Sequence, residues 1–154
     1  DVWNTGMNAI VIRYAEMLLS FAEAKIELNQ LDEAMYTALD RIRNRAGMPK
    51  VDRAKYSTQA KLRELVRRER RVELAMEGLR WFDVQRWKIG EQTMKGDVYG
   101  SLNEATITND VLQFTPSATP IVVETRDFKS HNYLWPIPQK EIDINKNLLP
   151  NNGY

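Results

Sequence analysis

A chain of 154 residues is long enough for one domain with a substantial core, and its 22 lysines and arginines nearly balance its 21 aspartates and glutamates. That balance argues against a broad basic surface for nucleic acid or for an anionic membrane. The absence of cysteine excludes disulfides, thiol nucleophiles and zinc–cysteine sites, and no apolar run approaches the roughly 18 residues that span a bilayer.

Residues 9–46 are predicted to form two antiparallel helices joined by a short turn. The first extends from Ala9 to about Leu28, and its apolar face is expected to hold Val11, Tyr14, Leu18, Phe21, Ala22 and Ile26. The second opens at Asp32 and Glu33, whose negative charge suits a helix N-terminus. Its expected buried positions are Leu31, Ala34, Met35, Ala38, Leu39 and Ile42. This hairpin resembles one tetratricopeptide unit, and a single unit does not support a solenoid.

Residues 58–89 are predicted to hold the long helix around which the rest of the chain packs. Ser57 or Thr58 is its expected N-cap, and Gly78 interrupts the helix after Glu77. Its predicted apolar stripe comprises Leu62, Leu65, Val66, Val72, Met76 and Leu79.

Two carboxylates, Glu69 and Glu73, stand on or beside that stripe, where a buried charge needs a cationic partner. We therefore predict an internal network of ion pairs that fixes how the helix docks. Its expected members are Arg13, Glu69, Arg70, Glu73, Glu77 and Arg80, with Arg67, Arg41 and Arg43 as further possible cations. A glycosidase acid/base pair is the alternative for these carboxylates, but nearby arginines would hold them ionised, unlike a general acid.

The helical pattern dissolves after Trp87. Residues 90–132 are predicted to be a loop-rich excursion with short strand-like pieces at Val111 to Phe114 and Ile121 to Glu124. Such a long stretch without a convincing helix is typical of a functional excursion or a surface wrap. Residues 133–154 are expected to form a Pro-Ile-Pro turn, a short helix over QKEID and an Asn-rich tail.

Three blocks of the chain resemble the SusD/RagB family, the nutrient-binding lipoproteins of the Bacteroidetes outer membrane. The family signature is matched by Glu69, Arg70, Arg71, Glu73, Leu74, Glu77, Gly78, Arg80, Trp81, Asp83, Arg86 and Trp87. The second block comprises Arg13, Tyr14, Ala15 and Glu16 with Arg43, Arg45, Ala46 and Gly47. The third is YLWPIPQKEI with the final Asn-x-Gly-Tyr, where Pro150 and Asn152 depart from the more usual Gln-Asn-Pro-Gly-Tyr ending.

The resemblance implies non-catalytic capture of an oligo- or polysaccharide, or a related nutrient, at the cell surface. It also implies delivery to a TonB-dependent, SusC-like transporter, with no cofactor, metal or nucleic acid involved. The chain begins without an initiator Met or a signal-like segment. We expect residues 1–154 to be the C-terminal portion of an outer-membrane protein, attached to the membrane only through a lipid anchor outside this chain.

Aromatic residues in or beside loops are the candidates for stacking on sugar rings, namely Trp3, Tyr99 and Tyr133. The aromatic residues expected to anchor the core instead are Trp81, Phe82, Trp87 and Trp135. His131, the single histidine, has no metal-ligand spacing and is expected at the surface.

The expected fold is all-α, with a tetratricopeptide-like hairpin, a long signature helix and a loop-rich C-terminal segment. No catalytic residue is predicted. A peptide-binding tetratricopeptide module is the functional alternative, favoured if the concave face of residues 9–46 is exposed and polar. An enzyme would require a cleft that holds a carboxylate of raised pKa.

Overall fold

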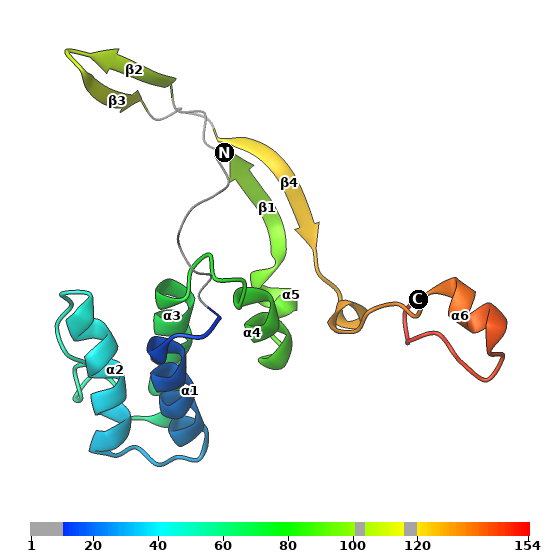
Figure 1. Ribbon diagram of the computed structural model, residues 1–154, viewed down its shortest axis with the longest axis horizontal. Helices are drawn as coiled ribbons and strands as arrows, with labels where there is room; N and C mark the ends of the chain where they lie inside the picture. Colours follow the sequence, from blue (N-terminus) through cyan, green and yellow to red (C-terminus); the bar gives the residue numbers. More distant parts are fainter. Residues whose placement is uncertain (1–10, 101–103, 116–119) are drawn as a thin grey trace. The chain divides into compact units, whose positions relative to one another are not determined.

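Residues 11–100, 104–115 and 120–154 are described by a computed structural model, and the chain divides into two units between Arg80 and Trp81. The first unit contains α1 (Tyr14–Glu27), α2 (Glu33–Arg45) and α3 (Gln59–Glu73). In Figure 1 these three helices lie together, and α1 packs against both α2 and α3. Trp3 belongs to residues 1–10, which lie outside the described ranges.

Local hydrogen bonds explain where the first two helices begin and end. Asp32 caps α2, its carboxylate accepting a hydrogen bond from the Met35 amide at 3.1 Å. Beyond α1 the backbone turns at Asn29, with φ of 55°, while the Gln30 amide donates to the Lys25 carbonyl at 2.8 Å. Gly47, with φ of 68°, ends α2 in the same manner. The predicted helical hairpin is therefore present.

The core of the first unit is formed by aliphatic side chains from all three helices. Its members include Leu19, Ala22, Ile26, Met35, Ala38, Leu39, Ile42, Leu62, Leu65 and Val66. Burying each large aliphatic side chain contributes about 1.5–3 kcal/mol, which makes this cluster the main source of stability in the unit. The small residues Ala22 and Ala38 are both buried in the cluster that joins α1 and α2.

The predicted apolar faces were wrong at several positions. Val11, Tyr14 and Phe21 are exposed, and Leu19 takes their place in the core. Ala34 is also exposed. The sequence of α1 is apolar on more than one side, so periodicity alone could not identify the side that packs.

The signature helix is shorter than predicted. Thr58 is its N-cap, as expected, but α3 ends at Glu73, and Met76 adopts a left-handed φ of 66°. Val72, near the end of α3, and Met76, beyond it, are exposed at 71% and 102%, whereas Leu74 is buried. The chain re-enters a helix only at α4 (Arg80–Arg86), after Gly78 with φ of 77°.

The second unit begins with the remainder of α4 and one turn of helix, α5 (Gly90–Thr93). Its strands are β1 (Lys95–Gly100), β2 (Glu104–Thr108), β3 (Val111–Thr115) and β4 (Ile121–Asp127). A 3₁₀ turn, η1 (Ser130–Tyr133), and α6 (Gln139–Ile144) follow. No helix within the described ranges is long and apolar enough to cross a membrane.

Antiparallel strands occupy much of the segment that we expected to be mostly loop. β1 pairs with β4, with Lys95 opposite Asp127 and an irregularity between Val98 and Tyr99. β2 pairs with β3 through a turn at Asn109 and Asp110, whose positive φ values of 53° and 60° suit a type I′ hairpin. The helical part of the all-α expectation is correct, and its strand content was underestimated. The predicted strand-like pieces at Val111 to Phe114 and Ile121 to Glu124 correspond to β3 and to the first part of β4, whereas β1 and β2 were not predicted.

Candidate functional site

The carboxylates of the first unit are held by arginines from other elements. Arg13, just before α1, donates to Glu73 from Nη1 at 2.7 Å and to both Glu77 oxygens from Nε at 2.9 Å. Arg45, at the end of α2, donates to Glu73 at 2.8 and 2.9 Å. Glu73 therefore joins the ends of three helices, and its side chain is only 9% exposed.

Charge pairing shifts the titration of two of these groups. The hydrogen bond from Arg13 lowers the pKa of Glu77 below its ordinary value. Hydrogen bonds to Glu77 and then Glu73 raise the pKa of Arg13. Both effects favour the charged forms, which suits structural ion pairing and opposes a general-acid role.

The remaining residues of the predicted network have different surroundings. Arg43 donates to Glu69 from Nη1 at 2.5 Å and to the Pro49 carbonyl from Nε at 2.7 Å. Arg70 is buried, with Nη1 at 3.4 Å from the Ser20 hydroxyl and Nη2 at 3.9 Å from Glu16. Arg80 is half-buried at the start of α4. Sequence reasoning missed Arg45, although the second matched block contains it.

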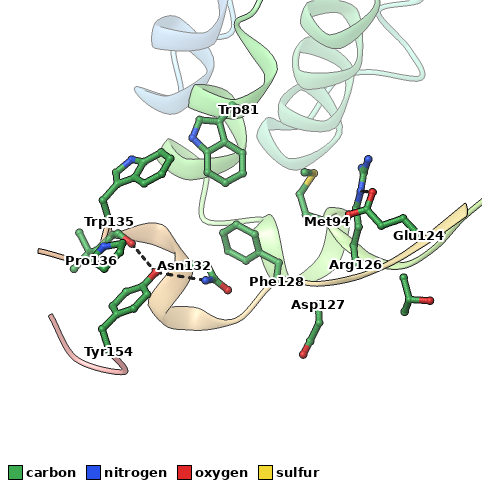
Figure 2. Close-up of a pocket in the computed structure, with 12 residues that line it drawn as sticks. Trp81, Met94, Glu124, Arg126, Asp127, Phe128, Asn132, Trp135, Pro136 and Tyr154 are labelled. Carbon is green, nitrogen blue, oxygen red and sulfur yellow. Dashed lines mark hydrogen bonds and ion pairs between the residues drawn. The ribbon is translucent and has the colours of Figure 1, made fainter. Parts of the chain in front are cut away.

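A pocket of about 570 Å³ lies within the second unit. Its walls are rich in aromatic and other apolar side chains, and they also include charged side chains and one amide. The lining residues are Trp81, Met94, Glu124, Thr125, Arg126, Asp127, Phe128, Asn132, Leu134, Trp135, Pro136 and Tyr154. Figure 2 shows Trp135 and Tyr154 toward one end, Glu124 and Arg126 toward the other, and Phe128 between them.

Trp81 and Phe128 in the pocket lining belong to an aromatic cluster that also contains Tyr133. Phe128 is 8% exposed and meets Trp81 and Tyr133 edge to face, at centroid distances of 6.0 and 4.9 Å. Gly90 makes room for it, because a Cβ at that position would lie 2.4 Å from the Phe128 ring. The Gly90 amide donates to the Tyr133 hydroxyl at 2.8 Å. The cluster is therefore fixed by packing and by a hydrogen bond.

Trp135 is the most exposed aromatic residue of the pocket, at 74%. Our expectation that it anchors the core was wrong for this chain, as it was for Phe82, which is 63% exposed. Trp81 and Trp87 are half-buried, and the Arg86 guanidinium lies 4.6 Å from the Trp87 ring centroid. A tryptophan that is exposed beside a fixed aromatic cluster offers a flat face to a ligand.

Charged residues in the pocket lining have ionic partners nearby. Arg126 lies 3.5 Å from Glu124, and Asp127 lies 3.3 Å from Lys129. Asn132 accepts a hydrogen bond from the Lys129 amide at 2.7 Å, and its amide nitrogen lies 3.5 Å from the Tyr154 hydroxyl. These groups can donate and accept hydrogen bonds while carrying little net charge.

Of the three predicted stacking residues, Trp3 lies outside the described ranges, and Tyr99 and Tyr133 are not among the residues that line the pocket. Tyr99 is 58% exposed on β1. Tyr133 is half-buried, and Lys88 Nζ lies 4.4 Å from its ring centroid. Sequence reasoning missed Trp135 and Tyr154 as candidates. The Trp-Pro step and the aromatic at the end of the Asn-rich segment were the available signals.

His131 is half-buried, and its ring lies 5.0 Å from that of Tyr154. Within the described part of the chain, no group of three or more His, Asp or Glu side chains is arranged to hold a metal ion.

Comparison with known proteins gives consistent matches along the chain. The SusD family model matches residues 1–154. The SusD-like protein P2 of Formosa agariphila is 32% identical over 156 residues, which cover 97% of this chain and 26% of that protein. A second Formosa agariphila protein, SusD-like protein P38, is 34% identical over 65% of this chain.

Solved structures give the same picture. A SusD-like protein from Bacteroides fragilis aligns with a TM-score of 0.74 and 36% identity, over 94% of this chain and 26% of that one. A SusD-like carbohydrate-binding protein from the same species aligns with a TM-score of 0.73 and 37% identity, over 90% and 28% of the two chains. The chain therefore spans about a quarter of the length of these relatives.

Proposed function

The chain belongs to the SusD family, and from this membership we propose that the protein captures a glycan or a related nutrient at the cell surface. SusD-like proteins are carbohydrate-binding and non-catalytic. Because the chain spans about a quarter of the length of its relatives, we infer the activity of the intact protein from the family and the pocket together.

We propose that the glycan binds in the pocket of the second unit, because Trp135 is exposed there. The C–H face of a pyranose ring is flat and apolar, so it packs against an indole without requiring a charge. Trp81 and Phe128 extend the apolar surface, and Asn132, Glu124 and Arg126 lie where hydroxyls at the ring edge can reach them. Capture then needs only stacking and hydrogen bonds.

The carboxylates support binding without cleavage. Glu69, Glu73 and Glu77 each accept hydrogen bonds from arginine, and we propose that this network is scaffold that fixes the ends of the three helices. In the pocket, Glu124 and Asp127 have cations within 3.5 and 3.3 Å. For Glu77, the hydrogen bond from Arg13 lowers the pKa and keeps the carboxylate charged, which is the opposite of what an acid catalyst needs.

Peptide binding by the helical hairpin is less well supported. That alternative required an exposed and polar face on residues 9–46. The exposed residues of α1 include Tyr14, Met17 and Phe21, at 60%, 46% and 45%. An apolar face of this kind suits packing against other protein better than recognition of a polar peptide.

We propose the location and the transporter partner from the family alone. SusD family proteins are cell-surface lipoproteins of the outer membrane and work with SusC-like transporters. For this protein we infer delivery of the captured glycan to a TonB-dependent transporter of that type, with membrane attachment through a lipid anchor outside this chain. Trp3, Tyr99 and Tyr133 remain predictions as additional stacking residues.

A printed array of neutral and acidic oligosaccharides, probed with the intact protein, tests the capture proposal. We expect retention of one structural class, with no shortened products when that glycan is incubated with the protein and analysed by chromatography. A blank array would overturn the proposal, and released products would overturn its non-catalytic part. Co-purification of a transporter from outer membranes tests the delivery step, which repeated recovery without any transporter would contradict.

A further inference from the structure

Residues 151–154 form a short turn that lies back along the segment carrying Trp135, and we call this turn the clasp. Asn151 Nδ2 donates to the Trp135 carbonyl at 2.6 Å. The Tyr154 hydroxyl donates to the Leu134 carbonyl at 3.0 Å. The clasp therefore holds the two consecutive peptide carbonyls of Leu134 and Trp135, and Figure 2 shows the Tyr154 ring beside this segment.

The turn that forms the clasp depends on glycine. Gly153 has φ of 97°, and the Tyr154 amide donates to the Asn151 carbonyl at 3.1 Å, which closes the turn. A Cβ on Gly153 would lie 2.7 Å from Cβ of His131. The His131 and Tyr154 rings meet at a centroid distance of 5.0 Å and an interplanar angle of 74°. The clasp therefore packs against η1 through the contacts of Gly153 and Tyr154 with His131.

The backbone of Trp135 is restricted from both directions. Pro136 follows it and limits Trp135 to extended conformations. The clasp fixes the carbonyls on both sides of the Trp135 α-carbon. The residue as a whole is 74% exposed, so we attribute most of the order at this position to the main chain.

We propose that the clasp is a positioning device for Trp135, and that Asn151 raises glycan affinity through Trp135 without touching the glycan. This inference rests on the capture function proposed above. Asn151 is not among the residues that line the pocket, whereas Tyr154 is. A substitution of Asn151 therefore tests the positioning of Trp135 without removing a direct contact to the glycan.

Preorganisation gives the expected direction of the effect. A platform that is already fixed loses little conformational freedom when a ring stacks on it. Without the Asn151 hydrogen bond, the Trp135 segment samples other positions, and binding must restore the productive one. Since a single hydrogen bond of this kind is involved, we expect Asn151→Asp to weaken glycan binding about 5- to 10-fold.

The chain offers a matched control at the next residue. Asn152 is exposed and no hydrogen bond of its side chain is described, so Asn152→Asp makes the same chemical change without removing the clasp. In the intact protein, calorimetric titration would use the oligosaccharide that wild type retains most strongly on the array. We expect Asn151→Asp to bind more weakly, Asn152→Asp to bind like wild type, and both to melt within about 2 °C of it.

A double-mutant cycle provides the readout that a merely structural role would not change. If Asn151 acts through Trp135, Asn151→Asp should have no further effect in a Trp135→Ala background, or in Trp135→Phe if binding to the alanine variant is undetectable. Additive losses would overturn positioning, and so would equal affinities for the two aspartate variants. Unchanged binding by Trp135→Ala, or a blank array, would instead overturn the pocket proposal and this inference with it.

Discussion

Replacement of Glu73 by glutamine tests whether the ion-pair network supports the fold. Glu73 is 9% exposed and accepts hydrogen bonds from Arg13 and Arg45. Glutamine preserves the size of the side chain and one acceptor oxygen, but it removes the negative charge. The change therefore isolates the electrostatic part of the contact.

The magnitude follows from the exposure of the two arginines. Arg13 is 25% exposed, so its charged hydrogen bond to Glu73 should contribute about 1.5–3 kcal/mol. Arg45 is 64% exposed, and an exposed pair of this kind contributes about 0–1 kcal/mol. Arg13 keeps Glu77 as a partner, which limits the loss. We expect Glu73→Gln to lower the free energy of unfolding by about 2–3 kcal/mol.

Urea unfolding followed by far-ultraviolet circular dichroism measures this difference, with Glu64→Gln as the control. Glu64 lies on the same helix and is exposed, so its replacement should change stability by less than about 0.5 kcal/mol. If the two variants unfold at the same urea concentration, the carboxylate at position 73 does not support the fold, and the scaffold interpretation is refuted.

Three further substitutions give independent tests. Gly90→Ala places a Cβ 2.4 Å from the Phe128 ring and should destabilise the second unit by about 1–3 kcal/mol, with loss of near-ultraviolet dichroism; an intact signal would contradict the packing. Met76 has a positive φ and a fully exposed side chain, so Met76→Gly should relieve backbone strain and raise the free energy of unfolding by about 1 kcal/mol. A lower urea midpoint would contradict the left-handed conformation at this position. Arg13 lowers the pKa of Glu77 from its ordinary 4.5, so the stability that Glu77 contributes is present above that pH and is lost as the pH falls through the lowered value. Glu77→Gln should remove this part of the acid dependence, and an unchanged stability–pH curve would speak against the pair.

The helical hairpin was predictable because its turn residues and core periodicity are local signals. Asp32 as a cap and Gly47 as a terminator can be read directly from the sequence. The end of α3 was not predictable in the same way, because apolar residues continue at helical spacing to Leu79. Leu74 packs into the core immediately after the helix has ended, a tertiary contact that the sequence pattern does not reveal.

Within residues 90–132, the sequence indicated β3 and the start of β4, where the β-branched run at Ile121, Val122 and Val123 favours a strand. It did not indicate β1, because the glycines at positions 96 and 100 in this strand are typical of loops. The Asn109–Asp110 turn was a usable signal, since both residues tolerate positive φ better than most.

The candidate site was likewise predicted in part. The sequence indicated that Glu69 and Glu73 needed arginines, because a buried carboxylate has few alternatives. It could not indicate that Trp135 is exposed, since a tryptophan beside proline is equally compatible with a core. The return of residues 151–154 onto the Leu134–Trp135 backbone beside this pocket is a tertiary contact that the sequence does not reveal.

The affinity of the intact protein for its array-selected oligosaccharide, compared with that of Trp135→Ala, tests most directly whether this pocket captures the glycan. Trp135 is 74% exposed, and a tryptophan has a surface of up to about 250 Å². A sugar ring stacked on it would cover about 80 Å² of that surface. At about 25 cal/mol per Å², the loss is about 2 kcal/mol, or roughly 30-fold in Kd. Phe82→Ala, which removes an exposed ring outside the pocket, should leave Kd unchanged. A Trp135→Ala variant that binds like wild type would contradict the account.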